Sequence, residues 1–215
     1  MDQTALVIAV DGPAASGKGT LSRRLAAHFG LAYLDTGSLY RGLAMLAMDK
    51  GLDLSDEQAV ALLAPKLDQS VLENPHLRDP GVGEAASKIA SLNHVRQALL
   101  TYQRNFAGKA PGAVLDGRDI GTVVCPDADV KLFVTASVEE RAKRRFKELI
   151  ANGKQVTLDE IEAEIKRRDA RDTSRNTAPL VQSEDAHLLD TTNLDIETAM
   201  SAAILLVKQA IDAKK

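Results

Sequence analysis

A glycine-rich segment between a short apolar run and an amphipathic stretch restricts the fold of this chain more than any other feature. Leu6 to Val10 is typical of a buried strand, and a helix is predicted from Lys18 to Phe29, with Gly30 at its C-terminal end. Glycines in the connection permit backbone angles that turn successive N–H groups toward an anion, and the helix N-terminus adds partial positive charge. The context predicts a phosphate-binding loop, made of Gly12, Pro13, Ala14, Ala15, Ser16, Gly17, Lys18, Gly19 and Thr20.

The residue after Lys18 departs from the common form of such a loop. A serine or threonine usually follows the lysine and binds Mg²⁺, but here the hydroxyl comes one position later, at Thr20. Asp116 ends the apolar strand Ala113–Leu115 as a Walker-B acid does, and it or Asp35 is expected to order the water shell of the ion. We therefore predict that Thr20, Asp35 and Asp116 hold Mg²⁺ through water, while Lys18 reaches the β- and γ-phosphates of ATP. A loop cap is the alternative role for either aspartate.

Apolar runs alternate with helical patterns along the chain, which predicts a single α/β domain. Its core is expected to be a five-stranded parallel sheet flanked by helices, with Thr36 or Ser38 capping the helix after the second strand and a last helix at about 196–213. The predicted strands are Leu6–Val10, Ala32–Leu34, Ala113–Leu115, Val130–Val134 and His187–Asp190.

Two stretches interrupt this alternation, so the core is predicted to comprise residues 1–51, 108–151 and 180–215. Residues 52–107 read as mostly helical, with breaks expected at Pro75, Pro80, Gly81 and Gly83. Residues 152–179 contain a charged helix that begins at a capping box formed by Thr157 and Glu160. Basic residues are concentrated between Arg141 and Arg175, and a charged helical insertion is either a solvated decoration or a lid that moves over a phosphate site.

Composition excludes several classes of protein. Aromatic residues are 3% of the chain and Trp is absent, which argues against a base-stacking nucleic-acid binder, as does the net charge of −3. Cys125 is the single cysteine, and the four histidines lack the spacing of metal ligands. No apolar run approaches the about 20 residues of a membrane span. We expect a cytoplasmic monomer without nucleic-acid or membrane partners.

Three further segments narrow the interpretation: Leu34–Arg41 after the second strand, Asp116–Val124 after the third, and Arg168–Arg175 in the charged insertion. Together with the Gly-Lys-Gly-Thr form of the loop, their order and spacing closely resemble the bacterial cytidylate kinases, which are nucleoside monophosphate kinases. The resemblance extends from Ile8 to the final helix. It implies a P-loop kinase fold in which 52–107 is a monophosphate-binding insertion and 152–179 is a lid. The implied reaction is Mg²⁺-dependent transfer of the γ-phosphoryl group of ATP to CMP or dCMP.

The acceptor residues also have a chemical rationale. Arg41 and Arg118 follow strands at the edge where α/β proteins bind ligands, and each can hold the acceptor phosphate bidentately. Asp119 can accept a hydrogen bond from the exocyclic amino group of cytosine, whereas uracil presents a carbonyl oxygen there. The resemblance adds to the CMP site Thr36, Tyr40, Ser87 and Arg96. On the sequence alone, Ser87 and Arg96 could pass as ordinary helix residues.

The lid contributes the remaining expected contacts. Arg168 and Asp172 are four residues apart on one helical face, so they form either an exposed ion pair or, as the resemblance implies, part of the site at the CMP ribose. The resemblance further places Arg171 and Arg175 at the transferring phosphates. So many arginines on a short segment repel one another unless anions arrive. The expected catalytic residues are Lys18, Arg118, Arg171 and Arg175.

Two alternatives remain open on the sequence. The first is a P-loop kinase of UMP, another nucleotide or a small metabolite, and the second is a nucleotide-dependent switch that binds a protein partner and barely turns over. A switch has no need of a second anion site, so the lid arginines argue against it. Residues 66–84 are too short and irregular for the full antiparallel β insertion common in the family, which predicts a more open acceptor site.

Overall fold

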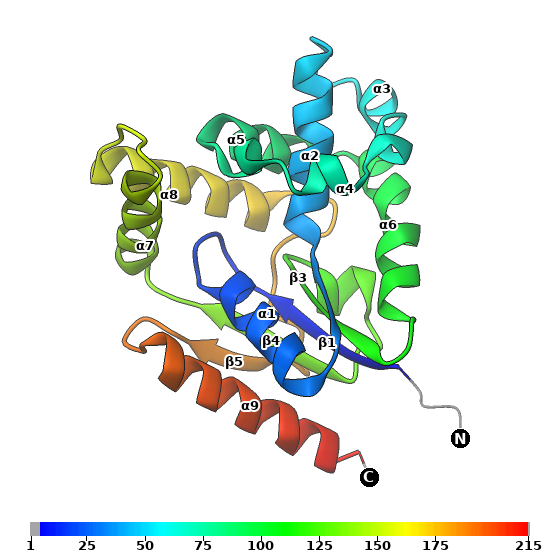
Figure 1. Ribbon diagram of the computed structural model, residues 1–215, viewed down its shortest axis with the longest axis vertical. Coiled ribbons are helices and arrows are strands. Elements are labelled where there is room, and N and C mark those ends of the chain that lie inside the picture. The colour runs from blue at the N-terminus through cyan, green and yellow to red at the C-terminus, as the bar shows by residue number, and fades with distance from the viewer. Residues whose placement is uncertain (1–4, 215) are drawn as a thin grey trace.

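The computed structural model describes residues 5–214, of which Pro80 is described by its backbone alone. Five parallel strands form one sheet in the order β2-β3-β1-β4-β5 (Figure 1). Each predicted strand is confirmed to within two residues at either end. The strands are β1 (Leu6–Asp11), β2 (Ala32–Asp35), β3 (Gly112–Gly117), β4 (Val130–Thr135) and β5 (His187–Asp190).

Helices cover both faces of the sheet because the buried strands alternate their side chains between two apolar cores. Ile8 and Val10 of β1 belong to the core under α1 (Lys18–Phe29) and α9 (Ile196–Asp212), which lie on one face (Figure 1). Ala9, between them, belongs to the core on the opposite face. The strand that leads into the glycine-rich loop is therefore held rigidly from both sides.

The second face is covered by α2 (Thr36–Asp49) and by the helices of residues 52–107. Within the described residues, this insertion contains no strand, in agreement with the absence of a full β insertion. Its elements are α3 (Glu57–Ala61), η1 (Ala64–Lys66), α4 (Gln69–Leu72), η2 (Pro75–Arg78), α5 (Pro80–Ile89) and α6 (Asn93–Ala107).

Of the four breaks expected in the insertion, those at Pro75 and Pro80 are confirmed, whereas those at Gly81 and Gly83 are wrong. Pro75 begins η2 and Pro80 begins α5, while Gly81 and Gly83 lie inside α5. Proline is tolerated in the first turn of a helix because the N–H group it lacks has no intrahelical acceptor there. These prolines therefore start helical segments rather than end them.

The predicted lid contains α8 (Leu158–Ser174), which forms a hairpin with α7 (Val138–Ala151), and this α7–α8 hairpin keeps the name lid. Ala142 and Leu149 of α7 form a separate small core with Ile161 and Ile165 of α8, so α7 packs with the lid although the sequence placed it with residues 108–151. The predicted capping box at the start of α8 is confirmed. No helix among residues 5–214 combines the length and apolar character needed to cross a membrane.

Candidate functional site

A pocket of about 640 Å³ lies at the carboxyl edge of the sheet, where the core, the insertion and the lid meet. Of the nine predicted loop residues, Ala14 to Thr20 line it, whereas Gly12 and Pro13 do not. Ten basic and eight acidic side chains are among its lining residues, so the pocket is positive although the chain carries a net charge of −3. This local excess suits anionic ligands.

Lys18 lies at the base of this pocket and is buried, with its ammonium donating to the carbonyl of Pro13 at 3.1 Å. Burial, reinforced by the nearby charge of Arg118, lowers the pKa of Lys18 to about 7. Gly12 and Gly17 have φ angles of +152° and +88°, conformations that side chains rarely adopt. The loop thus needs its two glycines, as predicted. The lowered pKa of Lys18 means that the neighbouring carboxylates do not offset the burial of its ammonium group, so an anionic ligand would stabilise the charged form.

The two carboxylates expected near Mg²⁺ belong to paired residues on adjacent strands. Asp35 ends β2 and pairs in register with Asp116 on β3. Burial, together with the charge of Asp35, raises the pKa of Asp116 to about 6, even though the hydroxyl of Tyr33 donates to this carboxylate at 2.6 Å. A divalent cation between these oxygen donors would relieve their repulsion, so the donor set fits Mg²⁺. Thr20 also lines the pocket.

The cap of α2 differs from its prediction. Asp35, rather than Thr36 or Ser38, is the N-cap residue, and its carboxylate accepts from the backbone N–H of Ser38 at 3.1 Å. The hydroxyl of Thr36 instead donates to the carbonyl of Asp116 at 2.7 Å. Aspartate caps well because a short acceptor reaches the free N–H groups of the first turn. Asp35 therefore has the capping role that was one of its two alternatives on the sequence, and it also lines the pocket.

Asp119 is buried in a cluster of aromatic and cationic groups. Arg96 donates to one of its carboxylate oxygens, and the Arg175 guanidinium lies 3.5 Å from the other. The Arg96 guanidinium is also 6.0 Å from the ring centre of Tyr40. Burial raises the pKa of Asp119, while Arg96 and Arg175 act against that shift. Arg175, expected at the transferring phosphates, lines the pocket from the residue just after α8, and there it is also a counter-charge for Asp119.

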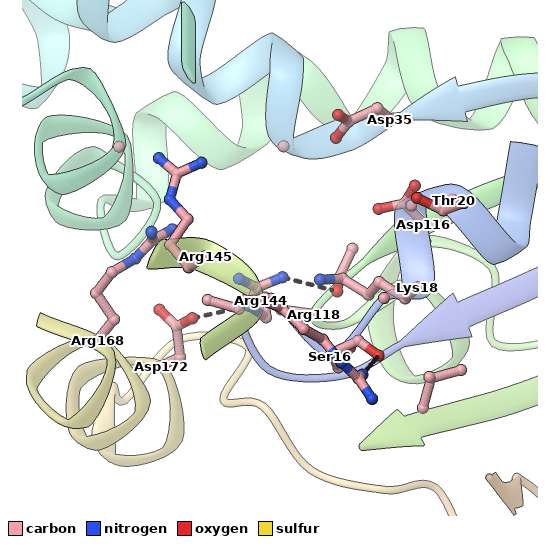
Figure 2. Close-up of a pocket in the computed structure, with 18 of the residues that line it drawn as sticks. Ser16, Lys18, Thr20, Asp35, Asp116, Arg118, Arg144, Arg145, Arg168 and Asp172 are labelled. Carbon is pink, nitrogen blue, oxygen red and sulfur yellow. Dashed lines mark hydrogen bonds and ion pairs between the residues drawn. The ribbon is translucent and has the colours of Figure 1, made fainter. Parts of the chain in front are cut away.

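Asp172 joins the lid to the core and the insertion. Its carboxylate accepts from Nε of Arg118 at 2.8 Å and from the hydroxyl of Ser87 at 3.3 Å, and Figure 2 shows Asp172 facing Arg118. Burial opposes ionisation of this carboxylate, but the charges of Arg118 and Arg168 outweigh it and hold the pKa of Asp172 below its ordinary value. Three residues predicted from separate segments are thus brought together.

The ion pair between Arg168 and Asp172 does not form. Arg168 pairs with Glu164, one turn earlier on the same helix, at 3.5 Å. Burial and the neighbouring charges of Arg118 and Arg41 lower the pKa of Arg168 to about 10, and its Nε has no hydrogen-bond partner among the described residues. Because Arg168 also lines the pocket, this unsatisfied buried donor is available to an anion there.

Two of the other predicted arginines differ in their positions. Arg41 lines the pocket and lies 3.6 Å from Asp35, and burial lowers its pKa. Arg171 does not line the pocket, because its guanidinium donates to Glu84 of the insertion at 2.6 Å. The structure therefore brings Arg41 to the site and holds Arg171 at the contact between lid and insertion.

Several pocket residues were missed by reasoning from sequence. Arg144 and Arg145 line the pocket (Figure 2). Both belong to α7, whereas Lys18 and Arg118 reach the pocket from other parts of the chain. Arg144 donates to the carbonyl of Thr191, just after β5, at 2.7 Å, and Thr191 donates to Ser16 at 3.1 Å. The concentration of arginines from residue 141 onward was the available signal. The missed lining residues include Arg23, Arg78, Arg144, Arg145, Thr191, Leu194 and Ile196.

Comparison with known proteins agrees with this geometry. A family model described as cytidylate kinase matches residues 8–209. A cytidylate kinase of Methylocella silvestris is 53% identical over 97% of this chain and 96% of its own length, and one of Brucella suis is 53% identical over 95% and 94%. An uncharacterised protein from Eubacterium ventriosum, at 16% identity and a TM-score of 0.55, shares the fold over 97% of this chain and 99% of its own. The chain belongs to the cytidylate kinase family.

Proposed function

We propose that this enzyme transfers the γ-phosphoryl group of ATP to CMP or dCMP, giving ADP and CDP or dCDP. The observation that carries the proposal is that one pocket joins the phosphate loop, residues 14–20, to the buried pair of Asp119 and Arg96. The loop suits the phosphates of the donor, and the carboxylate suits a base with an exocyclic amino group. The name of the related proteins points to the same substrate class.

The chemistry demands alignment and charge neutralisation rather than a protein nucleophile. A phosphate oxygen of CMP attacks in line, and it needs no general base because it is ionised at neutral pH. Lys18 holds the donor phosphates, while Arg41 and Arg118 hold the acceptor phosphate. Thr20, Asp35 and Asp116 would hold Mg²⁺, which would neutralise charge on the donor phosphates when bound. Closure of the lid excludes water and brings its cations to the γ-phosphoryl group.

Of the lid arginines that line the pocket, Arg144 and Arg145 are proposed for the transferring phosphates, because Arg168 is proposed for the ribose and Arg175 lies beside Asp119. Arg171 takes part only if its bond to Glu84 breaks on closure. Asp172 and Arg168 are proposed to bind the ribose. We propose that Arg175 keeps Asp119 charged against its burial and borders the base, since it lies beside that carboxylate.

An enzyme-linked assay of ADP release with CMP, dCMP, UMP and AMP tests the proposal. We expect CMP and dCMP to give the largest values of kcat/KM. Asp119→Asn should narrow the preference for CMP over UMP, because the amide offers a donor as well as an acceptor. Asp119→Ala should narrow it too, but it also leaves Arg96 and Arg175 buried without their counter-charge. Equal rates with CMP and AMP, or ADP release that no monophosphate stimulates, would contradict the proposal.

A further inference from the structure

Asp11 is a buried carboxylate that the proposed reaction does not use. It is the last residue of β1, directly before Gly12, and only 6% of its surface is exposed. Its two oxygens accept from the backbone N–H groups of Ile120 at 2.7 Å and Gly121 at 2.8 Å, about which the local sequence gives no hint because they lie 109 and 110 positions further along. The strand that leads into the phosphate loop is therefore bonded to the segment that follows Asp119.

That segment is η3 (Ile120–Val124), a turn of π-helix. Helix N-termini leave backbone N–H groups without intrahelical acceptors, and the side chain just before the helix ordinarily accepts from them. Here that residue is Asp119, and its side chain makes no capping bond. Its carboxylate is turned toward Arg96 and Arg175 instead. Asp11 supplies the missing acceptors from a different strand.

The other end of η3 is also held. Arg104 of α6 donates to the carbonyl of Val123 at 3.0 Å and to that of Val124 at 2.9 Å. A carboxylate at the N–H end and a guanidinium at the carbonyl end match the direction of the helix dipole. The carbonyl of Asp119 meanwhile accepts from the N–H groups of Val123 and Val124. The backbone of Asp119 is thus fixed by a short helix that is clamped at both ends.

Keeping an ionised group at position 11 is unfavourable for the fold. Burial, with a smaller contribution from the charge of Asp119, raises the pKa of Asp11 to about 6 despite the two N–H donors and the nearby charge of Lys18. An asparagine at position 11 would avoid most of the cost of burying a charge, but its side-chain NH₂ group would face one of the two backbone N–H donors. Only a carboxylate at position 11 offers acceptors to both N–H groups. We therefore infer that the aspartate serves to hold η3 in its observed geometry.

We propose that Asp11 is a positioning residue for base selection: by capping η3 in place of Asp119, it leaves the Asp119 carboxylate free to read the base. The same contact fixes that carboxylate relative to the strand carrying the phosphate loop. The inference rests on the proposed role of Asp119 in recognising cytosine.

The test compares kcat/KM for CMP with kcat/KM for UMP, because a general loss of folded enzyme lowers both equally and leaves their ratio unchanged. Asp11→Asn should lower this ratio by about tenfold or more, since a displacement near 1 Å at a site can cost about 10²-fold. Asp129→Asn is the matched control. Asp129 also accepts a backbone N–H of β1, from Val7 at 2.8 Å, but it does so at the opposite edge of the sheet. For Asp129→Asn, the ratio of kcat/KM for CMP to kcat/KM for UMP should equal that of the wild type.

A double-mutant cycle with Asp119→Asn shows whether Asp11 acts through Asp119. We expect Asp11→Asn to have no further effect on the ratio when Asp119 is already replaced. Independent, additive effects would overturn the inference, as would an unchanged ratio in Asp11→Asn while Asp119→Asn alters it. If Asp119→Asn itself leaves the ratio unchanged, the base-reading role fails and this inference fails with it. If Asp11→Asn does not fold, Arg104→Ala is the second test, because Arg104 is exposed and holds the other end of η3. This variant must then also lower the ratio.

Discussion

Replacement of Gly12 by alanine tests whether the phosphate loop needs the conformation that the structure gives it. A Cβ atom at this position would lie 2.0 Å from the carbonyl oxygen of Val134 in β4, whereas ordinary contacts are 3.4–4 Å. The φ angle of +152° adds strain for any side chain. Overpacking costs about 1–3 kcal/mol and a disfavoured backbone region a similar amount, so we expect Gly12→Ala to lose about 2–6 kcal/mol of unfolding free energy.

Gly30→Ala is the control for this variant. Gly30 also has a positive φ, +67°, but no atom lies within 4 Å of the position of its Cβ. We expect it to lose about 1 kcal/mol and to keep full activity. Urea unfolding and the ADP-release assay, run on both variants, give the comparison. Gly12→Ala should lose about 10²-fold or more in kcat/KM, because the loop must move by more than 1 Å. If both variants were equally stable and equally active, the reasoning would be refuted.

Three further predictions concern buried charges. Asp172→Asn should raise KM for CMP by about tenfold in steady-state kinetics, because it weakens a charged hydrogen bond that joins the lid to the core. Arg141→Ala should destabilise the fold by about 3 kcal/mol in urea unfolding, since it removes the guanidinium that lies 2.6 Å from the carboxylate of Asp169. Arg24→Ala, which removes an exposed ion pair with Glu197, should leave Tm unchanged. The pKa of Asp11 is raised in the fold to about 6 from 3.8, so its stability contribution is full below about pH 4 and is lost as pH rises through 6. The unfolding free energy of the wild type minus that of Asp11→Asn should therefore fall by about 2–3 kcal/mol between pH 4 and 7, and a flat difference would contradict this.

Short-range patterns in the sequence determined the sheet and the phosphate loop. Each strand was read from a few consecutive apolar residues between turn signals, and Gly12 and Gly17 were predicted from the backbone angles that the loop needs. The capping box of α8 lies within four consecutive residues, so its geometry follows from local chemistry. Residues 66–84 likewise showed their lack of a β insertion through their prolines and short length.

Tertiary structure alone decided which charges meet in the pocket. Helical periodicity put Arg168 and Asp172 on one face, but Asp172 pairs with Arg118, which is 54 positions away, and Arg168 pairs with Glu164. Arg175, the residue just after α8, lies 3.5 Å from Asp119. The bond from Asp11 to the start of η3 spans 109 positions. These pairs form because loops from distant parts of the chain meet at the carboxyl edge of the sheet. A pattern within a few consecutive residues cannot predict which of them will meet.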